Sequence, residues 1–279
     1  MIIACKCLID LNIGLEGDLL MTAVVDEEVT HEGITTLIKS GINADYAVVG
    51  EPTNLKISYA SMGKAEFQIE TQGKTAHCSR PELGINAIVK MAKIVSTLDS
   101  TLTKHLEEKR HPEFGTPVFT IVNIHGGALV TLSTVPEHCK IEIDRRLIPG
   151  ETYDEASKEI EDVLKQLKAK DPQLQAELKL TDEVLRYPRL PFETPVDSKI
   201  VTALSEAYMN IIGKETSLIA SSFYGDAEAL RNKLGTPTVY FGPSGPTPSS
   251  HSDYENVPID QVVVASKILA LTAIKICKT

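Results

Sequence analysis

The chain has 279 residues, of which 42% are hydrophobic and 24% are charged, and this balance is typical of a globular protein rather than a disordered one. The net charge of −10 disfavours nucleic acid and anionic membrane as partners, because both attract basic surfaces. No run approaches the ~18 uncharged apolar residues of a membrane span, and the five scattered cysteines indicate a reducing, cytoplasmic setting.

The first 62 residues predict the beginning of an α/β domain. Residues 1–13 carry apolar positions at helical spacing, and residues 31–40 predict a second helix. Residues 18–25 and 45–49 are near-continuous apolar runs, the pattern of strands buried on both faces of a parallel sheet. Helices and strands that alternate in this way favour an α/β fold.

The pattern changes in the middle of the chain, where alternating apolar and polar residues predict half-buried strands. The predicted order is strand, helix, strand, strand, helix, strand, over residues 64–71, 83–98, 117–124, 140–147, 152–167 and 175–180. This order is that of a ferredoxin-like α+β unit, with a four-stranded sheet and two helices on one face.

The α/β pattern returns after residue 197. It predicts helices over residues 198–212 and 226–234 and from about 258, and strands over residues 216–221 and 237–241. The simplest organisation is a split α/β domain, residues 1–62 and 184–279, with a mostly parallel sheet and an inserted ferredoxin-like α+β domain, residues 63–183.

Three adjacent acids, Asp26-Glu27-Glu28, follow the predicted strand 18–25. Ligand sites of open α/β sheets lie at the carboxyl ends of strands. A divalent metal would offset the mutual repulsion of these acids, with one carboxylate as a ligand and its neighbour as a general base. Acids that match the dipole of a helix N-terminus explain the same pattern equally well.

Two further candidate ligands follow predicted strands. Glu51 comes directly after strand 45–49, and His251 lies in the Gly/Pro/Ser-rich loop after strand 237–241. Taken singly, Glu51 is better explained as a turn acid and His251 as a solvated loop histidine. Together with Glu27 and Glu28, each at a strand end, they favour a metal-dependent hydrolase.

The inserted domain and one loop carry the remaining candidates. His77 lies in a loop between a strand and a helix. Arg145 and Arg146 are adjacent on an alternating strand, so only one of them can face a site and bind a substrate carboxylate, while a solvated strand face is the alternative. The loop that begins at Gly242 could offer backbone N–H groups to an anion, but it lacks the Lys of a nucleotide-binding P-loop.

The order of these motifs resembles the two-metal amidohydrolase/peptidase family of acetylornithine deacetylase, succinyl-diaminopimelate desuccinylase, aminoacylase and glutamate carboxypeptidase. Each motif is weak alone, but their order and spacing are specific, and the likeness extends from residue 1 to the C-terminus. The motifs are Asp26-Glu27-Glu28, Gly50-Glu51-Pro52-Thr53, Gly73 with His77, Pro81, Gly84 and Asn86-Ala87, Gly126-Gly127, Val135-Pro136, Asp144-x-Arg146-x-x-Pro149-Gly150, Gly225-Asp226-Ala227, Gly242-Pro243 and His251-Ser252-x-x-Glu255.

The resemblance implies an enzyme that hydrolyses N-acyl amino acids or small peptides with two zinc ions, or with cobalt or manganese. Glu27 would be the general base that activates the attacking water. Glu28 and His251 would bind one metal, and Glu51 the other. Arg146 would bind the substrate carboxylate. The inserted domain would be a lid that forms a homodimer, through which His77 stabilises the oxyanion in the partner's site.

Two departures from the family pattern bear on activity. Ser133 stands where the family has a substrate-binding Asn. The family also carries a His-x-Asp motif and a bridging Asp ahead of Asp-Glu-Glu, whereas the first histidine here is His31. We therefore expect an N-terminally incomplete catalytic domain and a polypeptide that is inactive or nearly so. A non-catalytic remnant that keeps the lid as a dimerisation module is the alternative.

Overall fold

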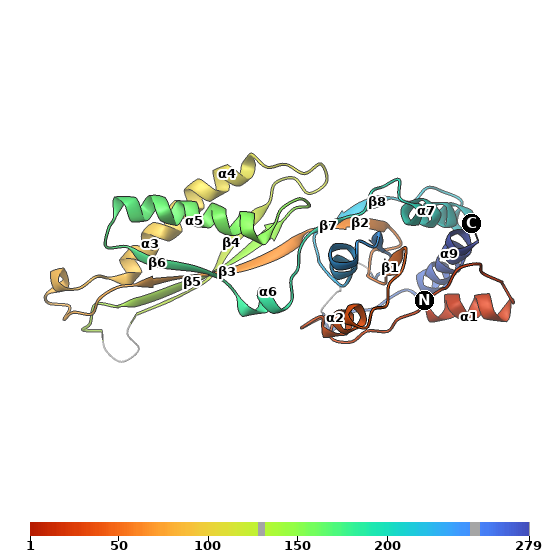
Figure 1. Ribbon diagram of the computed structural model, residues 1–279, viewed down its shortest axis with the longest axis horizontal. Helices are drawn as coiled ribbons and strands as arrows, with labels where there is room; N and C mark the ends of the chain where they lie inside the picture. Colours follow the sequence, from red (N-terminus) through yellow and green to blue (C-terminus); the bar gives the residue numbers. More distant parts are fainter. Residues whose placement is uncertain (128–131, 246–251, 279) are drawn as a thin grey trace. The chain divides into compact units, whose positions relative to one another are not determined.

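A computed structural model describes residues 1–127, 132–245 and 252–278 (Figure 1). The chain folds into two compact units. Unit 1 comprises residues 1–61 and 192–279, and unit 2 comprises residues 62–191. Residues 184–191, which the sequence-based division places in the split domain, fold with unit 2 because α6 (Asp182–Arg186) contacts β3 (Gly63–Gln72) of that unit.

Unit 1 contains a five-stranded mixed sheet. Its strands are β1 (Ala47–Val49), β2 (Ile57–Ser61), β7 (Phe192–Glu193), β8 (Leu218–Ser221) and β9 (Thr238–Tyr240). The order is β1-β9-β2-β7, with β8 also paired to β2. The longer ladders, β1 with β9 and β2 with β8, are parallel, and β2 runs antiparallel to β7 and β9. The sheet is thus less uniformly parallel than the apolar runs predict.

The helices of unit 1 agree with the sequence prediction. They are α1 (Ile2–Asp10), α2 (Glu32–Lys39), α7 (Lys199–Ile212), α8 (Ala227–Ala229) with a π-helical turn at Leu230–Leu234, and α9 (Ile259–Cys277). α7 lies against β2 and β9, and α9 packs against both α1 and α7 (Figure 1). Val201 and Leu204 of α7 and Ile268 of α9 are buried. None of the helices in the described ranges combines the length and hydrophobicity that a membrane span requires.

The strand predicted over residues 18–25 is wrong. These residues have no regular secondary structure, and Leu19, Leu20 and Val25 are exposed. A strand that is apolar on both faces needs hydrogen-bonded neighbours and covering layers to bury it. Within the part of the chain that the structure describes, no strand pairs with this run. The apolar pattern therefore has no sheet to join, although the acidic turn that follows it is in place.

Unit 2 has the predicted ferredoxin-like topology. β3, β4 (Val118–Gly126), β5 (His138–Leu147) and β6 (Gln175–Leu180) form an antiparallel sheet in the order β4-β5-β3-β6. The covering helices are α3 (Ala87–Thr97), a π-helical segment (Leu98–Leu102), α4 (Thr103–Glu107) and α5 (Tyr153–Lys170), with a short 3-10 turn at Pro81–Leu83. α5 begins with a capping box in which Thr152 and Glu155 satisfy each other's backbone amides.

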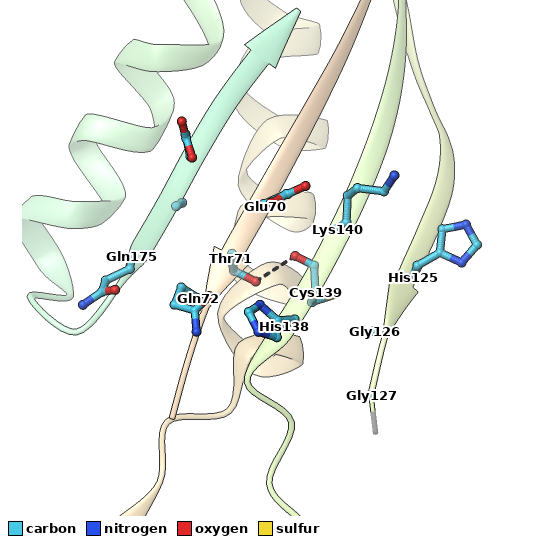
Figure 2. Close-up of a pocket in the computed structure, with 12 residues that line it drawn as sticks. Glu70, Thr71, Gln72, His125, Gly126, Gly127, His138, Cys139, Lys140 and Gln175 are labelled. Carbon is cyan, nitrogen blue, oxygen red and sulfur yellow. Dashed lines mark hydrogen bonds between the residues drawn. The ribbon is translucent and has the colours of Figure 1, made fainter. Parts of the chain in front are cut away.

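Alternation along the strands separates the two faces of this sheet. Phe67, Ile69, Ile141 and Ile143 are buried in one core with residues of α3 and α5. The opposite face carries polar side chains that include Glu70, Lys140 and His125 (Figure 2). Helices cover only the first face, as the sequence predicts for this fold.

Candidate functional site

Glu27 and Glu28 lie in a closed turn, residues 26–31, that links the exposed apolar run to α2. The carbonyl oxygen of Asp26 accepts the backbone N–H groups of Thr30 at 3.2 Å and His31 at 2.7 Å. Asp26 and His31 both have left-handed backbone angles, with φ of 65° and 51°. The turn is therefore a defined local structure, not the N-terminus of a helix, and the helical alternative for these acids is wrong.

Glu51 lies two residues beyond the end of β1, beside the residues that follow β9. Because β1 and β9 are parallel, their carboxyl ends meet at one edge of the sheet. Gly242 comes so close that a Cβ there would lie 2.5 Å from the carbonyl oxygen of Glu51. The Gly242 N–H donates to Thr53 Oγ1 at 3.2 Å. This amide is thus engaged within the fold, and its binding of a substrate anion stays a prediction.

Glu27 and Glu51 both lie beside Gly225. It lies between β8 and α8, and a Cβ on it would be 3.2 Å from Glu51 Oε1, 3.3 Å from Glu27 Oε1 and 3.1 Å from the Tyr240 hydroxyl. A side chain at this position would crowd both carboxylates. The fold therefore places Glu27 and Glu51 beside the same glycine, although they are far apart in the sequence.

The electrostatics of Glu51 reflect this crowding. Its pKa is raised from 4.5 to about 8, first by burial and then by the negative charges of the neighbouring carboxylates Glu27, Glu228, Asp226 and Glu28. A divalent cation among these groups would favour their ionised forms. The donor set, several carboxylates at one sheet edge, is therefore chemically suited to a metal ion.

Glu228 is a buried carboxyl that the sequence-based search missed. It accepts hydrogen bonds from Ser61 Oγ at 2.6 Å, the Tyr240 hydroxyl at 2.6 Å and the Gly225 amide at 2.8 Å. Burial raises its pKa to about 7, although these bonds act in the opposite direction, and burial also raises the pKa of Tyr240. The sequence gives little signal, because Glu228 is one of two acids at the start of a helix that also carries Arg231 and Lys233.

The metal set is not complete within the described residues. His251 lies outside them, so its position relative to Glu28 stays a prediction. Among residues 1–127, 132–245 and 252–278, no three His, Cys, Asp or Glu side chains are grouped so that they could hold a metal ion. The carboxylates are in place as donors, but the described residues alone do not make a closed coordination sphere.

The substrate-binding candidates His77 and Arg146 belong to unit 2. His77 is exposed, its Nδ1 lies 2.8 Å from Ser79 Oγ, and it pairs with Thr134 in an isolated bridge. The carbonyl oxygen of Ser133 accepts the Cys78 amide at 2.9 Å. Ser133, which replaces the family Asn, therefore lies on the segment beside the His77 loop.

The two adjacent arginines point to opposite faces of the sheet, as their alternation predicts. Arg145 is fully buried on the helical side and bonds Glu151 at 2.7 Å. Arg146 lies on the open face, where its Nε donates to Asp144 at 2.9 Å. Arg146 is therefore the one of the two that a ligand can reach.

The open face of the unit 2 sheet also carries a groove of about 660 Å³ (Figure 2). Glu70, Gln72, His138 and Lys140 line it, and at its floor Thr71 Oγ1 donates to the Cys139 carbonyl oxygen at 3.2 Å. Lys140 is engaged by Glu142 at 2.9 Å. Most of the lining side chains are exposed to solvent, so this surface lacks the enclosed polar groups that characterise a catalytic pocket.

Known proteins resemble this chain in sequence and in fold. Residues 59–172 match the family described as the peptidase dimerisation domain of M20 proteins. The chain is 30% identical over 280 residues to an acetylornithine deacetylase of Myxococcus xanthus, a match that covers 99% of this chain and 70% of the relative. Two acetylornithine deacetylases of Aliivibrio species are 29% identical, and the chain spans 65% of their length.

Solved structures share the fold. Aminopeptidase PepT of Bacillus cereus superposes with a TM-score of 0.78 at 20% identity, over 99% of this chain and 68% of that one. The Bacillus subtilis YXEP protein, a dinuclear metal-binding peptidase, superposes with a TM-score of 0.73 at 18% identity, over 99% of this chain and 70% of that one. The sequence match to these relatives and the match of residues 59–172 show that this chain belongs to the M20 family of metal-dependent amidohydrolases and peptidases.

Proposed function

We propose that this chain carries most of a metal-dependent hydrolase that cleaves amide bonds in N-acyl amino acids or small peptides with a free carboxylate. The observation that supports this best is the cluster in which Glu27 and Glu51 meet at Gly225 and the pKa of Glu51 is raised to about 8. Buried acids that repel one another at a sheet edge are costly for a purely structural role and suited to a cation-dependent one.

In this proposal Glu28 and His251 hold one metal ion and Glu51 holds the other, with zinc, cobalt or manganese as the candidates. Bound metal ions polarise a substrate carbonyl and lower the pKa of water. The Glu27 carboxylate takes a proton from the attacking water and delivers it to the leaving amide nitrogen. Glu27 suits this role because one of its oxygens reaches the same point beside Gly225 as an oxygen of Glu51.

Unit 2 supplies the substrate contacts. Arg146 binds the free carboxylate by exchanging its bond to Asp144 for the substrate. His77 follows the end of β3, whereas Arg146 pairs with Lys64 at the beginning of β3. The eight steps between Lys64 and Gln72 span roughly 26 Å. One copy of unit 2 therefore does not place both groups on one small substrate, which supports a role for His77 in a partner's site.

A homodimer would form through unit 2. β4 is an edge strand that pairs only with β5 in the described sheet. Its exposed residues include Val118, Val122 and Ile124, which are 53%, 59% and 55% exposed. Such an apolar edge favours pairing with another strand. We expect Val122→Lys to convert a dimer into a monomer in light scattering, and an unchanged mass would rule out this edge.

We further propose that the 279 residues alone have little or no hydrolase activity. A catalytic zinc site uses three protein ligands. Here Glu28 and His251 give the first metal ion two ligands, and Glu51 gives the second metal ion one. The test compares this chain with a chimera. The chimera adds the 30% of the Myxococcus xanthus deacetylase that this chain does not match, placed where those residues stand in the deacetylase. With added zinc or cobalt, we expect hydrolysis of N-acyl amino acids by the chimera only. Rapid hydrolysis by the chain itself would refute the inactivity, and an inactive folded chimera would refute the hydrolase.

The same chimera tests the unit 2 residues. Arg146→Ala is expected chiefly to raise KM, because it removes a contact present in both the bound substrate and the transition state. His77→Ala is expected chiefly to lower kcat, because an oxyanion forms only on the way to product. Kinetics that do not change would remove the role assigned to that residue.

A second candidate is a non-catalytic dimerisation module. The match of residues 59–172 to a dimerisation domain and the complete core of unit 2 favour it. This candidate predicts a stable dimer and no hydrolase activity in the chimera. Light scattering and the activity of the chimera therefore separate the two candidates.

A further inference from the structure

The turn that carries Glu27 and Glu28 has two non-glycine residues with left-handed backbone angles. Asp26 and His31 both have left-handed backbone angles, which non-glycine residues adopt uncommonly. The backbone bonds from Thr30 and His31 to Asp26 close the turn, but they do not tie it to the rest of unit 1. Some other contact must hold it in place.

The side chain of His31 makes one such contact. Its Nδ1 lies 2.9 Å from Oδ1 of Asp226, and the two residues are separated by 195 positions in the sequence. His31 is 9% exposed and Asp226 is 4% exposed, so the pair is shielded from water. The ring of Tyr224 lies 6.1 Å from the imidazole, on the same segment as Asp226.

Asp226 is also adjacent to the point where the acids meet. It directly follows Gly225, beside which Glu27 Oε1 and Glu51 Oε1 lie. The imidazole–carboxylate pair thus joins the turn that bears Glu27 and Glu28 to the segment that packs against Glu51. Because the Nδ1 of His31 is already occupied by Asp226, this nitrogen serves the protein scaffold.

We propose that His31 and Asp226 are positioning residues, which fix the turn 26–31 and so set Glu27 and Glu28 relative to Glu51. The inference rests on the proposed function only in that these are the carboxylates that would hold the metal and move the proton. Neither residue touches substrate in this proposal, and both act through the turn.

Amide hydrogen exchange of the 279-residue protein tests the pair independently of any activity. Asp226→Ala leaves the turn's own sequence intact, and we expect the amides of Thr30, His31 and Gly33 to exchange at least tenfold faster in it. The Phe241 amide, which donates to the Val49 carbonyl oxygen at 3.0 Å in the same unit, should exchange as before. Unchanged exchange in the turn, or equal loss at Phe241, would overturn the proposal.

A Co²⁺ titration followed by NMR supplies the second readout. We expect His31→Ala to weaken Co²⁺ binding at least tenfold. His31→Asn should restore the affinity to within about threefold, because Asn keeps an N–H donor near the Nδ1 position and tolerates a left-handed backbone. A loosened turn with unchanged Co²⁺ affinity would overturn the positioning role, as would failure of the Asn variant to recover.

If the unaltered protein binds no Co²⁺, the proposed metal site is refuted. The exchange result then decides by itself whether the pair holds the turn. Should Asp226→Ala not fold, Asp226→Asn keeps an acceptor for the imidazole and should leave the Thr30 and His31 amides protected. Rapid exchange in a folded Asp226→Asn would contradict the pairing.

Discussion

Two buried groups of charged side chains, one in each unit, are built in opposite ways. In unit 2, Arg145 and Lys109 bond to Glu151 at 2.7 and 2.8 Å, and both also contact Glu159. In unit 1, the groups that act most strongly on Glu51 are themselves carboxylates, and every one of them raises its pKa. The first cluster is balanced by its own chain and explains stability, whereas the second is suited to an added cation and points to function.

The direction of the pKa shifts makes the same distinction. Burial acts to raise the pKa of Glu151, but the bond from Lys109 and the charge of Arg145 outweigh it, and the net pKa is lowered. Burial lowers the pKa of Lys109, yet its bonds to Glu151 and Glu159 leave it raised. Both shifts favour the charged forms, while those of Glu51 and Glu228 favour neutral ones.

The largest expected effect breaks the balanced cluster. Arg145→Ala should lower the free energy of unfolding of unit 2 by about 3–5 kcal/mol, because it removes the fully buried one of the two cations that offset Glu151 and Glu159. Arg146→Ala is the matched control on the same strand, and since its ion pair is partly exposed it should cost about 0–1 kcal/mol. Urea unfolding, followed by hydrogen exchange of the β5 amides, measures the loss of stability in both variants. Equal losses would contradict the contrast between the two faces of the sheet.

The second prediction concerns pH in the absence of metal. Since the folded-state pKa values of Glu51 and Glu228 lie above 4.5, folded unit 1 binds more protons than its unfolded chain, and its stability should fall as pH rises from about 4.5 to 8. Unit 2 should keep the contribution of Glu151 above its ordinary pKa of 4.5 and lose it only on acidification.

Unit-resolved melting by NMR at pH 5, 6.5 and 8 checks this difference. A loss of about 1–2 kcal/mol lowers the melting temperature of a unit of this size by several degrees. Glu51→Gln, which cannot ionise, should flatten the profile of unit 1. A unit 1 that becomes more stable between pH 5 and pH 8 would contradict the assigned charges.

A smaller effect is expected at the glycine where the acids meet. Gly225→Ala should destabilise unit 1 by about 1–2 kcal/mol, because the new methyl group crowds Glu27, Glu51 and Tyr240. Gly14→Ala is the control, since nothing lies within 4 Å of a Cβ there and its φ is not positive. If thermal melting shows the same change for both variants, the close approach of the two carboxylates is wrong.

Sequence reasoning succeeded where a short-range pattern decides the structure. Successive side chains of β5 point to opposite faces of the sheet, so Arg145 and Arg146 lie on different faces. This holds for any sheet that buries one face. The order of strands and helices likewise indicates the ferredoxin-like unit. The run 18–25 failed for the converse reason, because burial of an apolar strand depends on neighbours that the run itself does not encode.

The parts of the site that were missed depend on long-range contacts. His31 reads as an ordinary loop histidine until Asp226 is brought to it from 195 residues away. Gly242 reads as a free amide until Thr53 is seen to accept its N–H. Motif order located the segments, but only the fold shows which of their groups are engaged with distant residues.

The most direct test of the central claim, that the acids of unit 1 form a divalent-cation site, is a Co²⁺ titration of the 279-residue protein at pH 8 with unit-resolved melting. We expect unit 1 to gain about 1.4 kcal/mol when Co²⁺ is at about 10 times its Kd. Unit 2 should not change, and Glu51→Gln should reduce the gain, because it removes a ligand of one of the two proposed ions. No shift in unit 1, or an equal shift in Glu51→Gln, would contradict the claim.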